Sequence, residues 1–221
     1  MAVQSVRENL LLLQKTIVPY TPNIIAVTKY YGLEAILDAY NAGLRDFGES
    51  RINDAEQKIL NLPSDVIKES NFHYIGHLQT NKVVKVVKYF DYIHSVDSVK
   101  LARVISVSAK EMNKTQKVLL QVNISEEVQK FGFSESELFE NFAEIQKLEN
   151  LEICGLMCMA PFGVSDAELD KIFMRAKQIK QELNKVYLTK MQELSMGMSN
   201  DYQRAVAQGA TMIRIGRNLF K

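Results

Sequence analysis

Two basic side chains at predicted strand ends are the residues of this sequence best suited to chemistry. Lys29 follows an apolar run (residues 24–27) and precedes Tyr30, so it stands where a buried strand gives way to a loop. A lysine partly withdrawn from water there would have a lowered pKa and a usable neutral amine. The alternative is a lysine that ends the strand and points into solvent. Without the rest of the chain, this alternative is the better interpretation of Lys29.

Arg214 is the second basic residue, inside the apolar run Met212-Ile213-Arg214-Ile215-Gly216. On a strand its side chain faces the same way as Met212 and Gly216. A permanent cation buried without partners would cost several kcal/mol, so an inward Arg214 needs a carboxylate or a bound ligand opposite it. The alternative is an outward Arg214 that meets an acidic helix residue, and the sequence leaves these two open.

An anion site is predicted close to Arg214 in the chain. Ser199 or Asn200 can cap a short helix from about residue 200, whose first amides would be free for an anion. Gly216 ends the next strand, where a missing side chain lets backbone amides approach an oxyanion. An amine after the first strand, a phosphate cradle after the last two and an arginine between them suit a phosphorylated aldehyde held by a lysine.

The elements that must position these residues alternate between strand and helix. Strand patterns begin near residues 24, 46, 72, 92, 117, 152, 193 and 212, and helical patterns separate nearly all of them. Strict alternation predicts parallel strands with right-handed crossovers, and eight such units close a barrel. An open doubly wound sheet is the alternative, but its usual glycine-rich turn after strand one is missing. We therefore predict a single (β/α)8 TIM-type barrel domain over residues 1–221.

Several element ends are predicted from capping residues and helical spacing. An extra N-terminal helix over residues 3–17 places Val3, Val6, Leu10, Leu13 and Ile17 on one face. Gly43 would stop one helix and Asp97 would cap another, while Ser134 and Glu137 form a capping-box pattern. The last long helix has a buried face running from Leu169 to Val186.

Composition excludes several classes of function. The 221 residues include 27 basic and 26 acidic side chains, so bulk attraction to nucleic acid or a membrane is not expected. The N-terminal leucines lack the layout of a signal peptide, and a cytoplasmic location follows as the default. Cys154 and Cys158 lie too far apart on a strand to form a disulfide, and are expected to be reduced core residues.

Other polar residues fall at or near strand ends, among them Glu49, Ser50 and His77. The three histidines, His73, His77 and His94, have no metal-ligand spacing, so hydrogen-bonded structural roles are expected and no metal site is predicted.

Segments spread along the chain resemble the pyridoxal-phosphate homeostasis proteins, single-domain relatives of alanine racemase. They are AVTK ending at Lys29, FGES with Glu49, IGHLQTNK over 75–82, QVNIS from Gln121, GLMCM from Gly155, LSMGMS ending at Ser199 and IRIG over 213–216. The resemblance implies a fold-type III barrel with pyridoxal 5′-phosphate bound to Lys29 as a Schiff base.

The same resemblance implies roles for further residues. Arg214 would face the pyridine nitrogen, and Ser199 with the amides of Gly216 and Arg217 would hold the phosphate. Ser50 and His77 would lie at the cofactor's edge. Ser50 stands where the family usually has asparagine, and Arg217 where a small or acidic residue is expected.

The expected chemistry favours a cofactor carrier. A carboxylate would keep the ring nitrogen protonated, but an arginine cannot accept that proton. Arg214 opposite the nitrogen would therefore leave the ring neutral and a weak electron sink. A second base for racemisation is not visible in the sequence. We therefore expect a monomeric protein of cofactor homeostasis that supplies pyridoxal-phosphate-dependent apoenzymes. The alternatives are a slow racemase or related amino-acid enzyme and a cofactor-free barrel aldolase.

Overall fold

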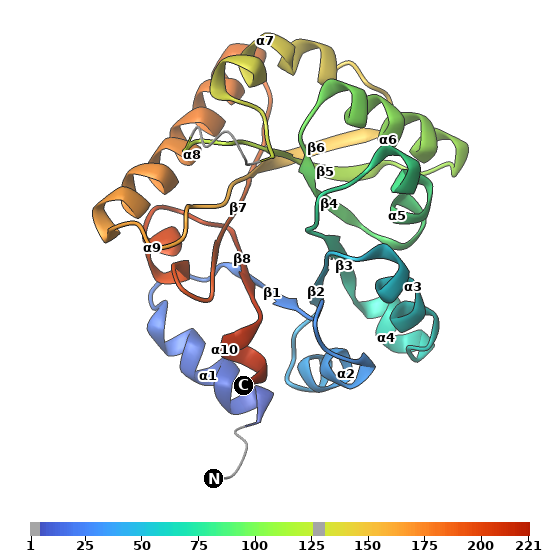
Figure 1. Ribbon diagram of the computed structural model, residues 1–221, viewed down its shortest axis with the longest axis vertical. Coiled ribbons are helices and arrows are strands. Elements are labelled where there is room, and N and C mark those ends of the chain that lie inside the picture. The colour runs from blue at the N-terminus through green and yellow to red at the C-terminus, as the bar shows by residue number, and fades with distance from the viewer. Residues whose placement is uncertain (1–4, 126–130) are drawn as a thin grey trace.

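The strands of this protein form a closed parallel barrel surrounded by helices (Figure 1). The computed structural model describes residues 5–125 and 131–221. Each strand pairs with its neighbours in chain order, and β8 pairs with β1 to close the ring. The predicted (β/α)8 barrel with an extra N-terminal helix is therefore confirmed.

Every strand begins within one residue of its predicted start. The strands are β1 Asn23–Val27, β2 Asp46–Glu49, β3 Asn71–Tyr74, β4 Tyr92–Val96, β5 Gln116–Gln121, β6 Leu151–Met157, β7 Glu193–Met198 and β8 Met212–Ile215. His77, which the sequence placed at or near a strand end, lies three residues beyond β3. These apolar runs are buried on both faces because helices cover the barrel and side chains fill it.

The helices surround the barrel in Figure 1. They are α1 Val6–Thr16, α2 Leu33–Asn41, α3 Ile52–Leu60, α4 Ser64–Glu69, α5 Val83–Tyr89, α6 Val99–Glu111, α7 Glu135–Ile145, α8 Asp166–Tyr187, α9 Tyr202–Ala207 and α10 Arg217–Phe220. A 3-10 turn, η1 Thr80–Lys82, precedes α5. The short helices α4 and α10 were not predicted from the sequence.

The barrel has a main core between strands and helices and a smaller interior. Along β1, Ile24 and Ala26 belong to the core packed against the helices, whereas Ile25 is fully buried on the opposite face. Arg214 pairs with Ile25 in the register of β8 and β1. Residues aligned in this way share a face, so Arg214 is carried into the barrel interior.

Two predicted helix ends are confirmed. Gly43 follows α2 with φ of +103°, a backbone conformation that suits glycine. Ser134 and Glu137 form the predicted capping box at the start of α7.

Other local predictions are wrong. Ser98 rather than Asp97 caps α6, its side chain accepting from the amide of Leu101. Asp201 occupies the N-cap of α9 in place of Ser199 or Asn200. Val186 is exposed because α8 has turned this position away from the barrel.

Cys158 is a buried thiol as expected, but Cys154 is only partly buried.

The N-terminal helix α1 packs beside α10 near the end of the chain. The side chain of Asn9 donates to the carbonyl of Leu219 at 3.0 Å and ties the two helices together. Leu10, Leu13 and Ile17 are buried as predicted, while Val3 lies outside the described residues.

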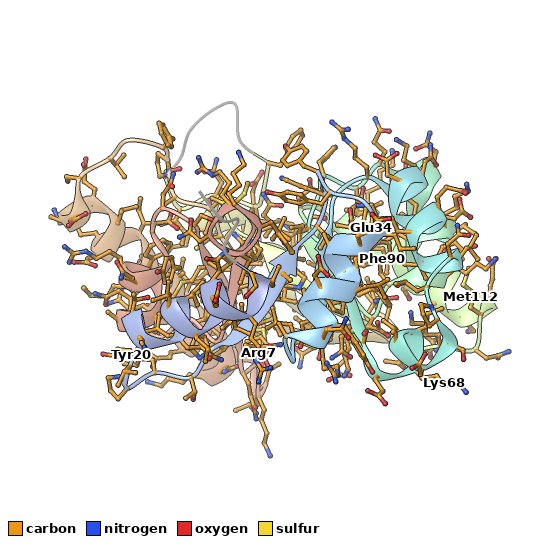
Figure 2. The ribbon with its side chains drawn as sticks, turned by 90° about the horizontal axis from the view of Figure 1, so that it is seen from below. Arg7, Tyr20, Glu34, Lys68, Phe90 and Met112 are labelled. Carbon is orange, nitrogen blue, oxygen red and sulfur yellow. The ribbon has the colours of Figure 1, made fainter. Side chains whose placement is uncertain are left out.

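In the side view of Figure 2, Tyr20 and Lys68, which precede β1 and β3, lie lower than Glu34, which follows β1. Among residues 5–125 and 131–221, none of the helices has the length and apolar character needed to cross a membrane.

Candidate functional site

A cavity of about 960 Å³ opens at the carboxyl end of the barrel strands. Its wall comes mainly from the segments that follow β1, β6, β7 and β8. The lining includes Lys29, Tyr30, Tyr31, Pro161, Phe162, Ser199, Asn200, Asp201, Arg214, Gly216 and Arg217. Its volume lies in the range of small-molecule sites. Parallel barrels place their chemistry at this end, because loops there vary while the strands stay rigid.

Lys29 lies two residues beyond β1 and is partly buried in the cavity wall. Its ammonium nitrogen lies 5.0 Å from the centre of the Tyr30 ring, and Tyr30 is 74% exposed. The predicted strand-end position of Lys29 is therefore confirmed. Its side chain contributes to the cavity wall and is only partly exposed to solvent.

The backbone before Lys29 is held by a buried ion pair behind the barrel wall. Glu49, 1% exposed, accepts at Oε1 from Thr28 Oγ1 at 2.7 Å and from Lys58 Nζ at 2.7 Å. Lys58 also donates to the carbonyl of Thr28 at 2.8 Å. The sequence pointed to Glu49 but gave no signal for Lys58, which has the spacing of an ordinary α3 surface lysine.

Arg214 faces the barrel interior and is 4% exposed. Its Nη1 donates to the carbonyl and the hydroxyl of Ser195 at 2.8 and 2.6 Å, and its Nη2 donates to the carbonyl of Cys158 at 3.0 Å. Neutral oxygens therefore accept from the guanidinium, whereas the sequence predicted a carboxylate or a bound ligand opposite an inward arginine. Burial lowers the pKa of the guanidinium, which nevertheless stays protonated near neutral pH.

The segments after β7 and β8 are tied together at the other side of the cavity. Asn218 Nδ2 donates to the carbonyl of Ser199 at 3.1 Å, and Arg217 Nη2 donates to Asn200 Oδ1 at 3.0 Å. Helix α10 begins at Arg217, so its first amides have no acceptor within the helix. Ser199, Gly216 and Arg217 thereby lie together on one wall of the cavity.

Asp201 adds a carboxyl group to this wall. Burial raises the pKa of Asp201 above its ordinary value, although the amide of Met198 donates to its Oδ1 and opposes that change. The raised pKa means that Asp201 takes up a proton more readily than an exposed carboxylate would.

Two of the predicted site residues, Ser50 and His77, are not among the described residues that line this cavity. His77 Nδ1 lies 3.3 Å from Asp97 Oδ2, and its ring stacks on Phe131 with centroids 3.7 Å apart. Ser50 accepts at its carbonyl from the hydroxyl of Tyr74 at 3.3 Å.

The remaining histidines lie inside the barrel. His73 and His94 are fully buried and contact each other, Nδ1 of His73 lying 2.9 Å from Nε2 of His94. The sequence predicted structural roles for both without identifying their partners. Within residues 5–125 and 131–221, no group of three His, Cys, Asp or Glu side chains is arranged to hold a metal ion.

Comparison with known proteins gives consistent results over the whole chain. The family model described as alanine racemase, N-terminal domain, matches residues 1–221. A pyridoxal phosphate homeostasis protein of Synechocystis is 42% identical over 202 residues, covering 91% of this chain and 92% of the relative. A protein of the same name from Vibrio alginolyticus is 37% identical over 207 residues, covering 91% and 87%.

Solved structures show the same relationship. PipY of Synechococcus elongatus with PLP bound has a TM-score of 0.89 and 37% identity, covering 98% of this chain and 100% of that chain. Alanine racemase of Clostridium difficile has a TM-score of 0.82 at 15% identity, covering 97% of this chain and 56% of that chain. This second likeness concerns the fold.

Proposed function

Since the chain belongs to the alanine racemase N-terminal domain family and, within it, to the pyridoxal phosphate homeostasis proteins, we propose that it reversibly holds pyridoxal 5′-phosphate on Lys29. The whole chain would act as a single cofactor-binding domain. Its role would be to buffer the cofactor supply, and rapid turnover of amino acids is not expected.

The residues around the cavity fit this cofactor. A phosphorylated aldehyde needs an amine, an anion site and a partner for its ring, and the wall offers Lys29, the Ser199 and Gly216 segments, and Arg214. Arg214 is the observation that carries the proposal. It is a buried cation whose barrel contacts leave Nε–H and one N–H of Nη2 for a ligand. Burying such a cation costs free energy, and a ligand that accepts from the remaining N–H groups would offset part of that cost.

Each residue has a defined task in this proposal. The amine of Lys29 would condense with the aldehyde carbon and release one water. Arg214 would donate a hydrogen bond to the ring nitrogen. Ser199 and the amides of Gly216 and Arg217 would bind the phosphate, as helix N-termini favour anions. When bound, the cofactor supplies an electron-accepting ring.

The contacts of Arg214 favour the carrier over an enzyme. A carboxylate would keep a ring nitrogen protonated, but an arginine donates a hydrogen bond and never accepts that proton. The acceptors seen for Arg214 in the described residues are a hydroxyl and two carbonyls, so no carboxylate accepts directly from the guanidinium there. A ring left unprotonated withdraws electrons weakly, which disfavours fast racemisation.

Absorbance titration tests the proposal. Adding pyridoxal phosphate to the apoprotein should produce a visible band in the wild type and in Lys82→Ala, an exposed lysine on η1. Lys29→Ala should give no such band. A wild type that stays colourless at saturating cofactor would overturn the proposal.

A second assay separates the carrier from the enzyme. The loaded protein should restore activity to an apoenzyme of amino-acid metabolism, while isomerising L-alanine no faster than Lys29→Ala does. Rapid isomerisation that is lost in Lys29→Ala would identify a racemase instead. A monomeric state, a cytoplasmic location and transfer to apoenzymes stay predictions, and size-exclusion chromatography with light scattering checks the first.

A further inference from the structure

A continuous line of hydrogen bonds crosses the barrel interior and ends on Arg214. Its members are the side chains of Asp46, His73, His94, Ser195 and Arg214, and all five residues are buried. His73 Nε2 lies 2.7 Å from Asp46 Oδ1, and His73 Nδ1 lies 2.9 Å from His94 Nε2. His94 Nδ1 lies 2.9 Å from Ser195 Oγ, which lies 2.6 Å from Arg214 Nη1. We call this line the interior relay.

The interior relay spans the barrel from one wall to another. Its members come from β2, β3, β4, β7 and β8, and the step from His94 to Ser195 joins residues 101 positions apart in the chain. Apolar side chains usually fill this space in parallel barrels. A buried polar line is stable only when each member has its partner.

The chemistry of its two ends favours one direction of donation along the interior relay. Arginine only donates, so Ser195 Oγ accepts from Arg214 and can give its own hydrogen to His94 Nδ1. His94 then carries its hydrogen on Nε2 and donates to Nδ1 of His73. His73 in turn donates from Nε2 to the carboxylate of Asp46, which only accepts. Each hydrogen bond then runs from the cation towards the anion.

The opposite direction needs one more proton inside the barrel. Either His73 would carry hydrogens on both nitrogens or Asp46 would be protonated, with His94 donating from Nδ1 to Ser195. Burial, followed by repulsion from His73 and Arg214, holds the pKa of His94 well below its usual range. A neutral His94 places no second positive charge beside Arg214.

We propose that Ser195 and His94 are positioning residues that fix the Arg214 guanidinium for the ring of the bound cofactor. This rests on the proposed function. The hydroxyl and carbonyl of Ser195 occupy both N–H groups of Nη1, which leaves Nε and part of Nη2 for the ligand. Because arginine does not release its proton, the interior relay holds a side chain in place and conducts no proton.

Proton positions in the cofactor-free protein test the relay directly. The chain has only three histidines, so ¹⁵N spectra of the imidazoles are readily assigned. At pH 7.5 we expect His94 to carry its hydrogen on Nε2, with Nδ1 bare. A hydrogen on Nδ1 of His94 would overturn the proposed direction.

Cofactor binding by two serine variants tests the positioning role. Ser195→Ala removes the hydroxyl, one of the three acceptors of Arg214, and we expect the Kd of pyridoxal phosphate to rise about tenfold, with a shifted visible band. Ser95→Ala is the matched control. Ser95 is 1% exposed and adjoins His94 in β4, and its Oγ has no hydrogen-bond partner in the described residues. Its Kd and band should match the wild type.

The outcomes separate this inference from the proposed function. A wild type that binds the cofactor, with Ser195→Ala matching it in Kd and in spectrum, would overturn the positioning role and leave the carrier intact. A wild type that binds no cofactor would refute the carrier function and also the proposed positioning of Arg214 for the cofactor ring. The ¹⁵N spectra would still decide the direction of the relay.

Discussion

Lys58 reaches from α3 to the buried carboxylate of Glu49, its Nζ lying 2.7 Å from Oε1, and the same Nζ donates to the carbonyl of Thr28. Thr28 is the residue before Lys29. The ion pair therefore anchors the chain segment that presents the candidate cofactor lysine, although neither charged group lines the cavity.

Removing Lys58 should destabilise the fold strongly. Lys58→Met leaves Glu49 buried without its cation, and loss of one partner of a buried pair costs about 3–5 kcal/mol of unfolding free energy. Urea unfolding checks the loss. Lys110→Met is the control, because the Lys110 and Glu149 side chains are 70% and 77% exposed. That change should stay within about 0.5 kcal/mol, and equal losses in the two variants would contradict the role of Glu49.

Arg214→Lys should weaken cofactor binding although it keeps the charge. An ammonium group lacks the planar fork that spans Ser195 and Cys158, so at least one buried acceptor loses its donor. We expect the Kd of pyridoxal phosphate to rise about tenfold and the unfolding free energy to fall by about 1–3 kcal/mol. Arg103→Lys, on an exposed helix face, should leave both unchanged. Wild-type affinity in Arg214→Lys would show that the fork is dispensable.

Stability should fall as the solution is acidified below neutrality, because His94 is buried in its neutral form. The groups that face it are His73, Ser195, Arg214 and the ring of Tyr92. Its folded pKa is depressed by burial. Below about pH 6.5 the unfolded chain therefore binds a proton that the folded chain does not. The unfolding free energy should fall by up to about 1.4 kcal/mol per pH unit there.

His94→Gln isolates this contribution. Urea unfolding at pH 7.5 and 5.5 should show a smaller acid loss in His94→Gln than in the wild type, whereas His77→Gln should keep the full loss. An acid loss of the same size in His94→Gln would contradict the buried neutral imidazole.

Cys154 should react slowly with thiol reagents in the native protein. Burial, aided by the charge of Glu152, raises the pKa of the Cys154 thiol to about 12. At pH 8 only about one thiol in ten thousand would then be the reactive thiolate. Disulfide-exchange reagents should label both cysteines within minutes in guanidinium chloride but not in native buffer. Rapid labelling of the native protein at Cys154 would contradict its shielding.

The positions of the strands and of several site residues could be predicted from the sequence. The apolar runs identified all eight strands, and parallel barrel geometry then placed Lys29, Ser199, Gly216 and Arg214 at one end. Alternation along β8 could not decide whether Arg214 faced inward, because that depends on the register between β8 and β1.

Other features had no local signal. Ser195 lies within an apolar strand, and its histidine partner is 101 residues away. Lys58 has the spacing of a solvent-facing helix residue, yet its side chain folds back onto β2. Asp97 has the residue type of a helix cap, but Ser98 satisfies the helix instead, leaving Asp97 for His77. In each case the deciding contact joins residues from different elements.

Identification of the residue that carries the cofactor tests the central proposal most directly. The protein would be loaded with pyridoxal phosphate, reduced with borohydride, digested and mapped by mass spectrometry. We expect the reduced adduct on Lys29 alone, with little or none on exposed lysines such as Lys82. An adduct spread over surface lysines, or one absent from the Lys29 peptide, would contradict covalent binding in the barrel cavity.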